Sequence, residues 1–184
     1  MKDIKIKSKR EFRKVLVVEP DECGACRICE VVCSLVREGE CNPAKSRIQI
    51  LRREMLEVPL ICQQCEVLFC ASVCPEGAIG RDENTGAVLV DEKICNGCGI
   101  CIEACPFKAV FYDSKEKKVL ICDLCRGNPQ CVEWCPRESL QYLPGTASLR
   151  RKKTKGAQKC FLLLNEIRRG ISKKIQIITK TEVS

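Results

Sequence analysis

The chain has 184 residues, a length suited to one domain or to two small ones. Only 4% of its residues are aromatic whereas 18 are cysteines, so bound metal is expected to fill and crosslink a thin side-chain core. The absence of histidine excludes Rieske clusters, histidine-ligated haem, and zinc or iron sites that need imidazole. Metal ligation therefore falls on thiolates.

The formal net charge is +8, and the basic surplus is local. Residues 148–184 carry eleven Lys and Arg against two Glu, whereas the remainder has 21 basic and 22 acidic residues. The first ten residues lack the apolar run of a signal peptide, and no run approaches the roughly 20 apolar residues that span a bilayer. We therefore expect a cytoplasmic protein with no membrane span, whose reduced cysteines bind metal in place of forming disulfides.

Short strand-like runs and groups of four cysteines alternate along the chain. Val15–Val18 precedes the first group, a strand near Ser46–Leu51 follows it, and Ala87–Val90 and Val119–Ile121 precede the third and fourth groups. The four groups are Cys23, Cys26, Cys29, Cys33; Cys62, Cys65, Cys70, Cys74; Cys95, Cys98, Cys101, Cys105; and Cys122, Cys125, Cys131, Cys135. The predicted repeating unit is a strand, a ligand loop, a helical turn and a proline.

The third group has the spacing C-x2-C-x2-C-x3-C-P, which holds [4Fe–4S] clusters in bacterial ferredoxins. Three cysteines on one irregular loop can bind three corners of a cubane, while the fourth faces a second cluster. Gly97 and Gly99 allow the loop to approach the cluster closely, and Pro106 ends the helical turn. The first group has Ser34 where the others have proline; we interpret it as a modified site because its four cysteines are all present.

Several other residues next to these groups carry weaker expectations. The two remaining cysteines, Cys41 and Cys160, are expected to be free thiols. Aromatic side chains are expected to shield clusters from water, and three acidic residues to be solvated surface charges. These are Phe69, Phe107, Phe111 and Trp134, and Glu76, Asp123 and Glu138. The sequence contains no nucleophile–base pairing, G-x-G-x-x-G motif or P-loop, so we expect no catalytic centre.

The C-terminal extension is predicted to begin with a basic linker, Arg150–Lys155, and to continue as an amphipathic helix. The apolar face of this helix is formed by Cys160, Leu164, Ile167 and Ile171. Docking to a partner protein is the favoured interpretation of this face, with packing on the chain's own body as the alternative. A membrane surface or nucleic acid is least favoured, because Phe161 is the one aromatic residue of the extension.

Two other kinds of protein compete with this interpretation. A zinc protein would use four thiolates per site, but such sites are usually built from paired C-x2-C knuckles and not from three cysteines on one loop. A free-standing polyferredoxin that serves several enzymes has the same cysteine pattern as a dedicated subunit. Spacing alone also leaves two pairings of the groups open: outer with outer and inner with inner, or first with second and third with fourth.

On their sixteen ordered cysteines, residues 13–143 resemble the ferredoxin-like iron–sulfur subunits of molybdenum and tungsten oxidoreductases, the DMSO-reductase-B type. The resemblance implies that the outer groups share clusters with each other and that the inner groups do the same. It implies four [4Fe–4S] sites, with three occupied sites as the alternative. Their ligands would be Cys23, Cys26, Cys29 and Cys135; Cys33, Cys122, Cys125 and Cys131; Cys62, Cys65, Cys70 and Cys105; and Cys74, Cys95, Cys98 and Cys101.

The expected fold is α+β, with two interlocked ferredoxin-like modules at residues 13–147 and an amphipathic helical tail within the basic extension 148–184. The inner module spans about residues 55–113, and the outer module uses 13–54 and 114–147. The expected function is transfer of single electrons to or from the large catalytic subunit of an oxidoreductase, with a further donor or acceptor protein. The resemblance implies a tungsten– or molybdenum–pterin partner, as in the aldehyde oxidoreductases and tungsten-type benzoyl-CoA reductases of anaerobes.

Overall fold

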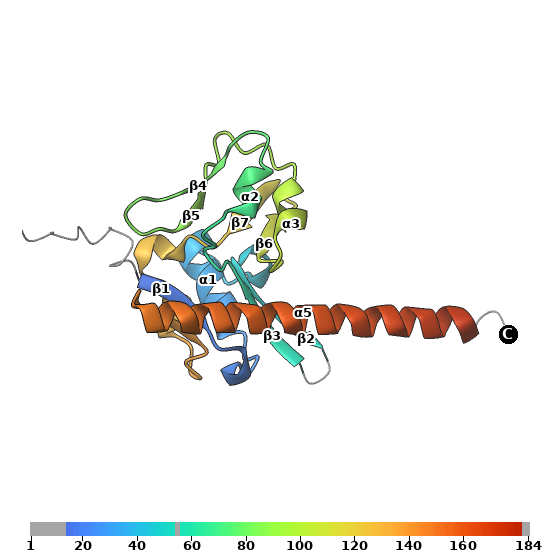
Figure 1. The fold of residues 1–184 in the computed structure, drawn as a ribbon. Coiled ribbons are helices and arrows are strands. Elements are labelled where there is room, and N and C mark those ends of the chain that lie inside the picture. Colours follow the sequence, from blue (N-terminus) through green and yellow to red (C-terminus); the bar gives the residue numbers. More distant parts are fainter. Residues whose placement is uncertain (1–13, 54–55, 182–184) are drawn as a thin grey trace, which may run out of the picture.

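A computed structural model describes residues 14–53 and 56–181. The first ten residues, from which we expected no signal peptide, lie outside this part. Figure 1 shows a body of short strands, short helices and loops, with the long helix α5 (Ala147–Thr181) running along one side. This mixture of helices and small sheets confirms the α+β class. Within the described residues, no helix is both long and apolar enough to cross a membrane.

The strands of the described residues form four antiparallel pairs. They are β1 (Lys14–Val18) with β8 (Leu140–Pro144), β2 (Ile48–Arg53) with β3 (Leu56–Ile61), β4 (Ile79–Arg81) with β5 (Val88–Val90), and β6 (Val110–Asp113) with β7 (Lys118–Ile121). The four strand-like runs of the sequence correspond to β1, β2, β5 and β7. Because a two-stranded ribbon is marginal alone, these sheets depend on packing against the rest of the body.

The helix that follows each ligand loop is short wherever a proline follows the last cysteine. These helices are α2 (Phe69–Ser72), α3 (Ile100–Ala104) and α4 (Gln130–Glu133). In the first group α1 (Ile28–Glu38) runs on for 11 residues, because Ser34 allows the helical hydrogen bonds that a proline would remove. The buried Ser34 hydroxyl donates to the Val31 carbonyl and accepts the Asn42 N–H, both at 3.0 Å. The first group therefore differs by a longer helix, and its Ser34 hydroxyl also binds the backbone of the segment that follows that helix.

Three 3-10 helices complete the described elements, η2 (Pro20–Glu22), η3 (Pro43–Lys45) and η4 (Leu124–Gly127). The interior consists of two clusters of buried side chains, and cysteines contribute to both. The larger cluster joins apolar residues of β1, β2 and β3 to Cys29, Cys33, Cys122 and Cys131. The smaller one contains residues of the four strands β4, β5, β6 and β7 and includes Cys101. Thiols thus occupy positions that aliphatic side chains fill in an ordinary core.

The structure corrects two expectations for the C-terminal extension. Arg150–Lys155 is not a linker, because these residues belong to the continuous helix α5. The apolar face is not free for a partner: Cys160, Leu164 and Ile167 are buried in the larger core cluster, at 2%, 4% and 5% exposure. The side chain of Ile171 lies outside the described residues. The apolar face of α5 therefore packs on the chain's own body, which was the alternative interpretation.

Gly156 makes the close contact between α5 and β1 possible. A Cβ atom at this position would lie 2.0 Å from the Val18 carbonyl oxygen, so any side chain would force the helix away from the strand. Glycine is normally costly inside a helix, by about 1 kcal/mol relative to alanine. Here the close approach requires it.

Gly156→Ala is therefore expected to lower the free energy of unfolding, by about 1–3 kcal/mol, although alanine is the better helix former. Thermal unfolding of the cluster-loaded protein, followed anaerobically by circular dichroism, measures the effect. Gly80→Ala is the matched control, because a Cβ there meets nothing within 4 Å. A Tm for Gly156→Ala equal to or above that of the unsubstituted protein would contradict the packing.

Candidate metal centre

The four ligand loops share one backbone feature. The second residue after the first cysteine of each group has a left-handed conformation, with φ of 48° at Ala25, 50° at Gln64, 70° at Gly97 and 56° at Leu124. Glycine adopts this conformation easily, whereas other residues do so at a cost. Sequence reasoning found Gly97 alone; the other three could have been found from their equivalent positions in the repeat.

This turn directs backbone hydrogen bonds at the first thiol of the group. Burial raises the pKa of the Cys23, Cys62 and Cys122 thiols, to about 12 at Cys62. The backbones of Ala25, Gln64 and Leu124, respectively, hydrogen-bond these sulfur atoms and oppose the increase. Such bonds stabilise negative charge on sulfur, and so they also stabilise a thiolate bound to iron.

Two quartets of thiols each surround a hollow in the surface. Cys23, Cys26 and Cys29 line the first hollow together with Cys135, which is more than a hundred residues further along the chain. The second is lined by Cys62, Cys65, Cys70 and Cys105. Each hollow also takes expected aromatic neighbours: Trp134 lies at the first, and Phe69 and Phe107 lie at the second. Trp134 and Phe69 remain 59% and 51% exposed, so they cover these hollows only in part.

The remaining cysteines of the four groups gather in two further places. Burial, followed by the charges of Cys33 and Cys125, raises the pKa of Cys131, and Cys33 also acts on Cys122 and Cys125. Burial similarly raises the pKa of Cys101 to about 11, and Cys95 and Cys98 contribute. Cys74 and Cys95 each pack against the core cluster that contains Cys101. The structure thus brings the fourth cysteines of the first, third and fourth groups, Cys33, Cys105 and Cys135, toward the cysteines of a different group.

The quartets also follow one another in a definite order. In addition to burial, the charge of Cys29 raises the pKa of Cys131, that of Cys62 raises the pKa of Cys122, and that of Cys70 raises the pKa of Cys101. These three electrostatic interactions link the first quartet to the Cys33 quartet, the Cys33 quartet to the Cys62 quartet, and the Cys62 quartet to the Cys95 quartet. The arrangement is a row of four with two ends.

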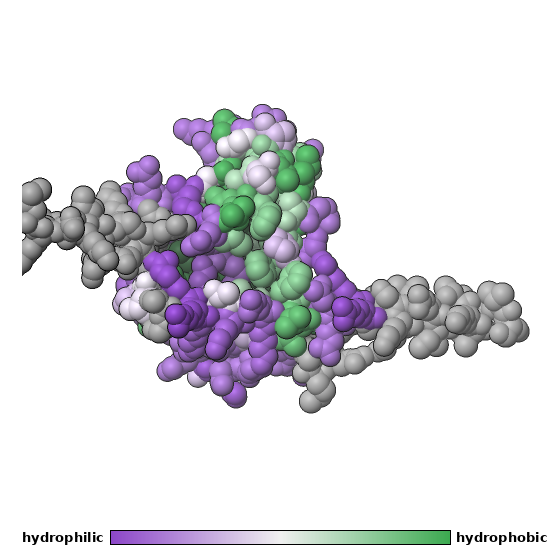
Figure 2. Space-filling model, viewed as in Figure 1, coloured by the Kyte–Doolittle hydropathy of each residue, from purple (hydrophilic) through white to green (hydrophobic). Residues whose placement is uncertain are grey.

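The two ends of the row reach the surface. Cys26 at one end and Cys98 at the other are the exposed members of the sixteen cysteines, whereas Cys33, Cys122 and Cys131 in the interior are buried. Exposed apolar side chains flank the Cys98 end, including Ile94 and Ile100, both 49% exposed. Figure 2 shows hydrophobic residues gathered over α2 and α3 on this part of the surface.

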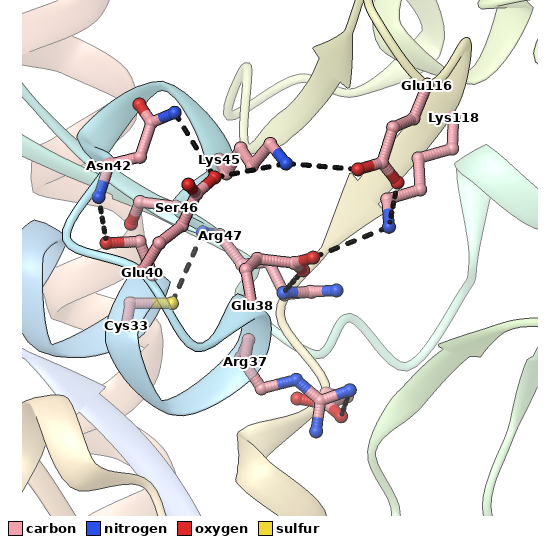
Figure 3. Close-up of polar contacts among 12 residues, drawn as sticks. Cys33, Arg37, Glu38, Glu40, Asn42, Lys45, Ser46, Arg47, Glu116 and Lys118 are labelled. Carbon is pink, nitrogen blue, oxygen red and sulfur yellow. Dashed lines mark hydrogen bonds and ion pairs between the residues drawn. The ribbon is translucent and has the colours of Figure 1, made fainter.

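Two backbone N–H groups donate to thiols from outside the ligand loops. The Arg47 N–H lies 3.3 Å from Cys33 Sγ, and the Ala109 N–H lies 3.4 Å from Cys105 Sγ. Figure 3 shows how the first is held: Arg47 binds Glu38 at 2.7 Å, and Glu38 also contacts Lys118 at 3.5 Å. Hydrogen bonds to ligand sulfur raise a cluster's reduction potential, so this network fixes a donor that affects electron affinity.

Asp123 and Gln64 are structural residues that the sequence did not reveal. The expectation that Asp123 is solvated was wrong: it is 8% exposed, accepts the Cys125 N–H at 3.1 Å and pairs with Arg37 at 3.0 Å. The buried Gln64 side chain donates to the Cys122 carbonyl and accepts the Val88 N–H, each at 2.7 Å. It therefore joins the second ligand loop to the fourth loop and to β5.

The donor sets fit iron–sulfur clusters. Across residues 14–53 and 56–181, no group of three or more Cys, Asp or Glu side chains is placed to hold a single metal ion. A cubane presents a separate iron to each thiolate, so its four ligands stand further apart than those of a single zinc ion. Four thiols around an apolar hollow suit that larger group. Thiols must lose their protons to bind metal. Burial opposes this loss, because it raises the pKa of the Cys29 thiol to about 12.

Comparison with known proteins identifies the family. The family model described as a 4Fe-4S dicluster domain matches residues 53–145. The chain therefore belongs to the 4Fe-4S dicluster family and carries multiple [4Fe–4S] clusters. Its function, as expected from the sequence, is electron transfer.

Curated relatives cover a range of enzyme systems. The polyferredoxin-like subunit of an aliphatic sulfonate oxidoreductase from Pyrococcus furiosus is 46% identical over 121 residues, which are 65% of this chain and 70% of the relative. The thiosulfate reductase electron transfer subunit PhsB of Salmonella typhi is 32% identical over 143 residues, 70% of this chain and 74% of the relative. Among solved structures, the complex BamBC of benzoyl-coenzyme A reductase with benzoyl-CoA is 26% identical over 70% of this chain and 78% of that one, with a TM-score of 0.42.

Gly97→Ala is expected to release iron from the third ligand loop. A Cβ at Gly97 would lie 2.2 Å from the Lys117 carbonyl oxygen, on a residue whose φ is +70°. Relief of that contact moves the loop that carries Cys95 and Cys98, so the purified protein should contain about four irons fewer per chain, one cubane. Iron and acid-labile sulfide analysis measures the loss. Gly77→Ala, with a φ of +62° and no atom within 4 Å of its Cβ, should keep its iron; equal iron in both variants would contradict the prediction.

Proposed function

We propose that the sixteen cysteines hold four [4Fe–4S] clusters in one row and that single electrons pass along it between two redox partners. The observation that carries this proposal is the order of the thiol quartets. In this proposal each quartet combines three cysteines of one loop with the fourth cysteine of another, and thiols of neighbouring quartets interact electrostatically. Short steps of this kind suit one-electron transfer, in which no bond is made or broken by the protein.

These neighbours support the ligand sets that the cysteine pattern implies. The first cluster is held by Cys23, Cys26, Cys29 and Cys135, and the second by Cys33, Cys122, Cys125 and Cys131. The third is held by Cys62, Cys65, Cys70 and Cys105, and the fourth by Cys74, Cys95, Cys98 and Cys101. In the proposed mechanism, the loops position thiolates and amide donors, and the apolar side chains keep water from the interior clusters. The clusters supply the electron acceptor states.

The domain organisation that we propose is a polyferredoxin body at residues 13–147 and the extension at 148–184. Pairing of β1 with β8 brings together the two flanks of the outer module, and the β4–β5 pair lies between the two groups of the inner module at about 55–113. The extension contributes α5, which packs on β1 and covers the outer module. The part of the extension that includes Cys160, Leu164 and Ile167 is therefore packed on the body.

The partner that we propose is the large catalytic subunit of a tungsten– or molybdenum–pterin oxidoreductase in the cytoplasm of an anaerobe. Its support is the cysteine pattern shared with that class of electron-transfer subunit, together with relatives named as subunits of a sulfonate oxidoreductase and a thiosulfate reductase. One exposed end of the row would face the catalytic subunit and the other a donor or acceptor protein.

Anaerobic affinity purification of the full chain from its source cells tests this partner. We expect a large subunit to co-purify in constant ratio, with tungsten or molybdenum at about one atom per complex. The matched control is the protein purified from the same cells after its clusters are removed. Purification of the cluster-loaded chain alone would contradict the dedicated-subunit proposal and favour the shuttle.

Cys26→Ser and Cys135→Ser variants test the ligand sets. If both thiols bind one cluster, each variant loses the same EPR signal and about four irons, and the double variant loses no more than either single variant. Cys41→Ser is the control, because Cys41 lies outside the quartets and is exposed. Additive losses in the double variant would show that Cys26 and Cys135 serve different clusters, as adjacent pairing of the groups requires.

A further inference from the structure

A lysine of α5, Lys153, lies next to the second ligand loop. Lys153 is half-buried, and its Nζ donates to the Gln64 carbonyl at 3.4 Å, between Cys62 and Cys65 in the chain. Burial lowers the pKa of this ammonium group, while the negative charges of Cys65 and Cys62 raise it. The ammonium therefore lies at the ligand loop of the third quartet.

A second cation lies at the same loop. Arg81 of β4 donates through Nη2 to the Cys65 carbonyl and through Nη1 to the Gly86 carbonyl, the latter at 2.6 Å. Its charge also acts on Lys153 and on Cys65. Glu66 is the acidic residue whose charge reaches Lys153. Two cations and one carboxylate thus surround this ligand loop.

The first quartet, two places away along the row, has different surroundings. The charges of Glu57 and Glu30 act on Cys23 and Cys29, respectively. Each carboxylate is also paired with an arginine, Glu57 with Arg52 at 3.3 Å and Glu30 with Arg27 at 3.0 Å. At the second quartet, Arg37 acts on Cys125, but it is paired at 3.0 Å with Asp123, which acts in the opposite sense. The thiol geometry repeats along the row, whereas the charges around it do not.

We propose that the positive charge of Lys153 raises the reduction potential of the cluster held by Cys62, Cys65, Cys70 and Cys105, and makes it the electron sink of the row. This inference rests on the ligand sets of the proposed function. Reduction adds one electron to the cluster, supplied by the neighbouring cluster, and adds one unit of negative charge. A nearby cation stabilises the reduced form more than the oxidised form, most effectively where burial limits screening by water.

The experiment compares Lys153→Met, Lys153→Gln and Lys153→Arg in the full cluster-loaded chain, by EPR-monitored redox titration. At the potential where the site is half reduced in the unsubstituted protein, Met and Gln should lower the ratio of reduced to oxidised cluster about tenfold, or about 59 mV for a one-electron couple. Arginine should restore the ratio to within about twofold. The affected signal should be the one that Cys105→Ser abolishes.

Lys152→Met is the matched control, because Lys152 is the preceding residue of α5 but points to Glu19, at 3.0 Å, and should leave every potential unchanged. Unshifted potentials in Lys153→Met and Lys153→Gln with full iron would overturn the inference and leave the proposed row intact. Loss of iron from both, or the same shift in Lys153→Arg, would overturn it by showing a structural role. Failure of the unsubstituted chain to hold clusters would instead overturn the proposed function.

Discussion

The structure depends on contacts between cysteine groups that are far apart in the sequence. Cys135 lies at the same hollow as Cys23, Cys26 and Cys29, and this is the place where the two ends of the body meet. Pairing of β1 with β8 follows from that closure, because both strands are adjacent to these loops. The four sheets in the described residues are too small to hold a fold together alone, so the thiols and the bound clusters supply the long-range constraints.

The sequence predicted much of this architecture because cysteine spacing is a geometric statement. Three thiols on one loop and a fourth one turn later determine the loop, the turn and the strand between groups, and the strands at Val88–Val90 and Lys118–Ile121 lie where the pattern put them. Left-handed residues such as Ala25 and Leu124 were not found, since their side chains do not favour that conformation. Tertiary contacts and the repeat impose it on them.

Features that depend on distant partners were beyond the sequence. An apolar stripe on a helix shows that something covers it but not whether the cover is the chain itself, and so α5 was assigned to a partner. Gly156 was the residue that could have decided the question, because a glycine inside a helix often marks a close approach to backbone. In the same way, no local pattern indicates that Gln64 bridges two ligand loops or that Asp123 is buried against Arg37.

The features that the four ligand sites share and the features that distinguish them come from different residues. The repeated loops place equivalent thiols and equivalent backbone donors at each site, so by themselves they would give clusters of similar potential. The residues proposed to make the surroundings unequal are not ligands: Lys153 comes from α5, Arg81 from β4, and Glu57 from β3 in the connection after the first group. If Lys153 raises the potential of its cluster as proposed, a helix outside the ligand loops makes one site of the repeated arrangement different without altering a ligand.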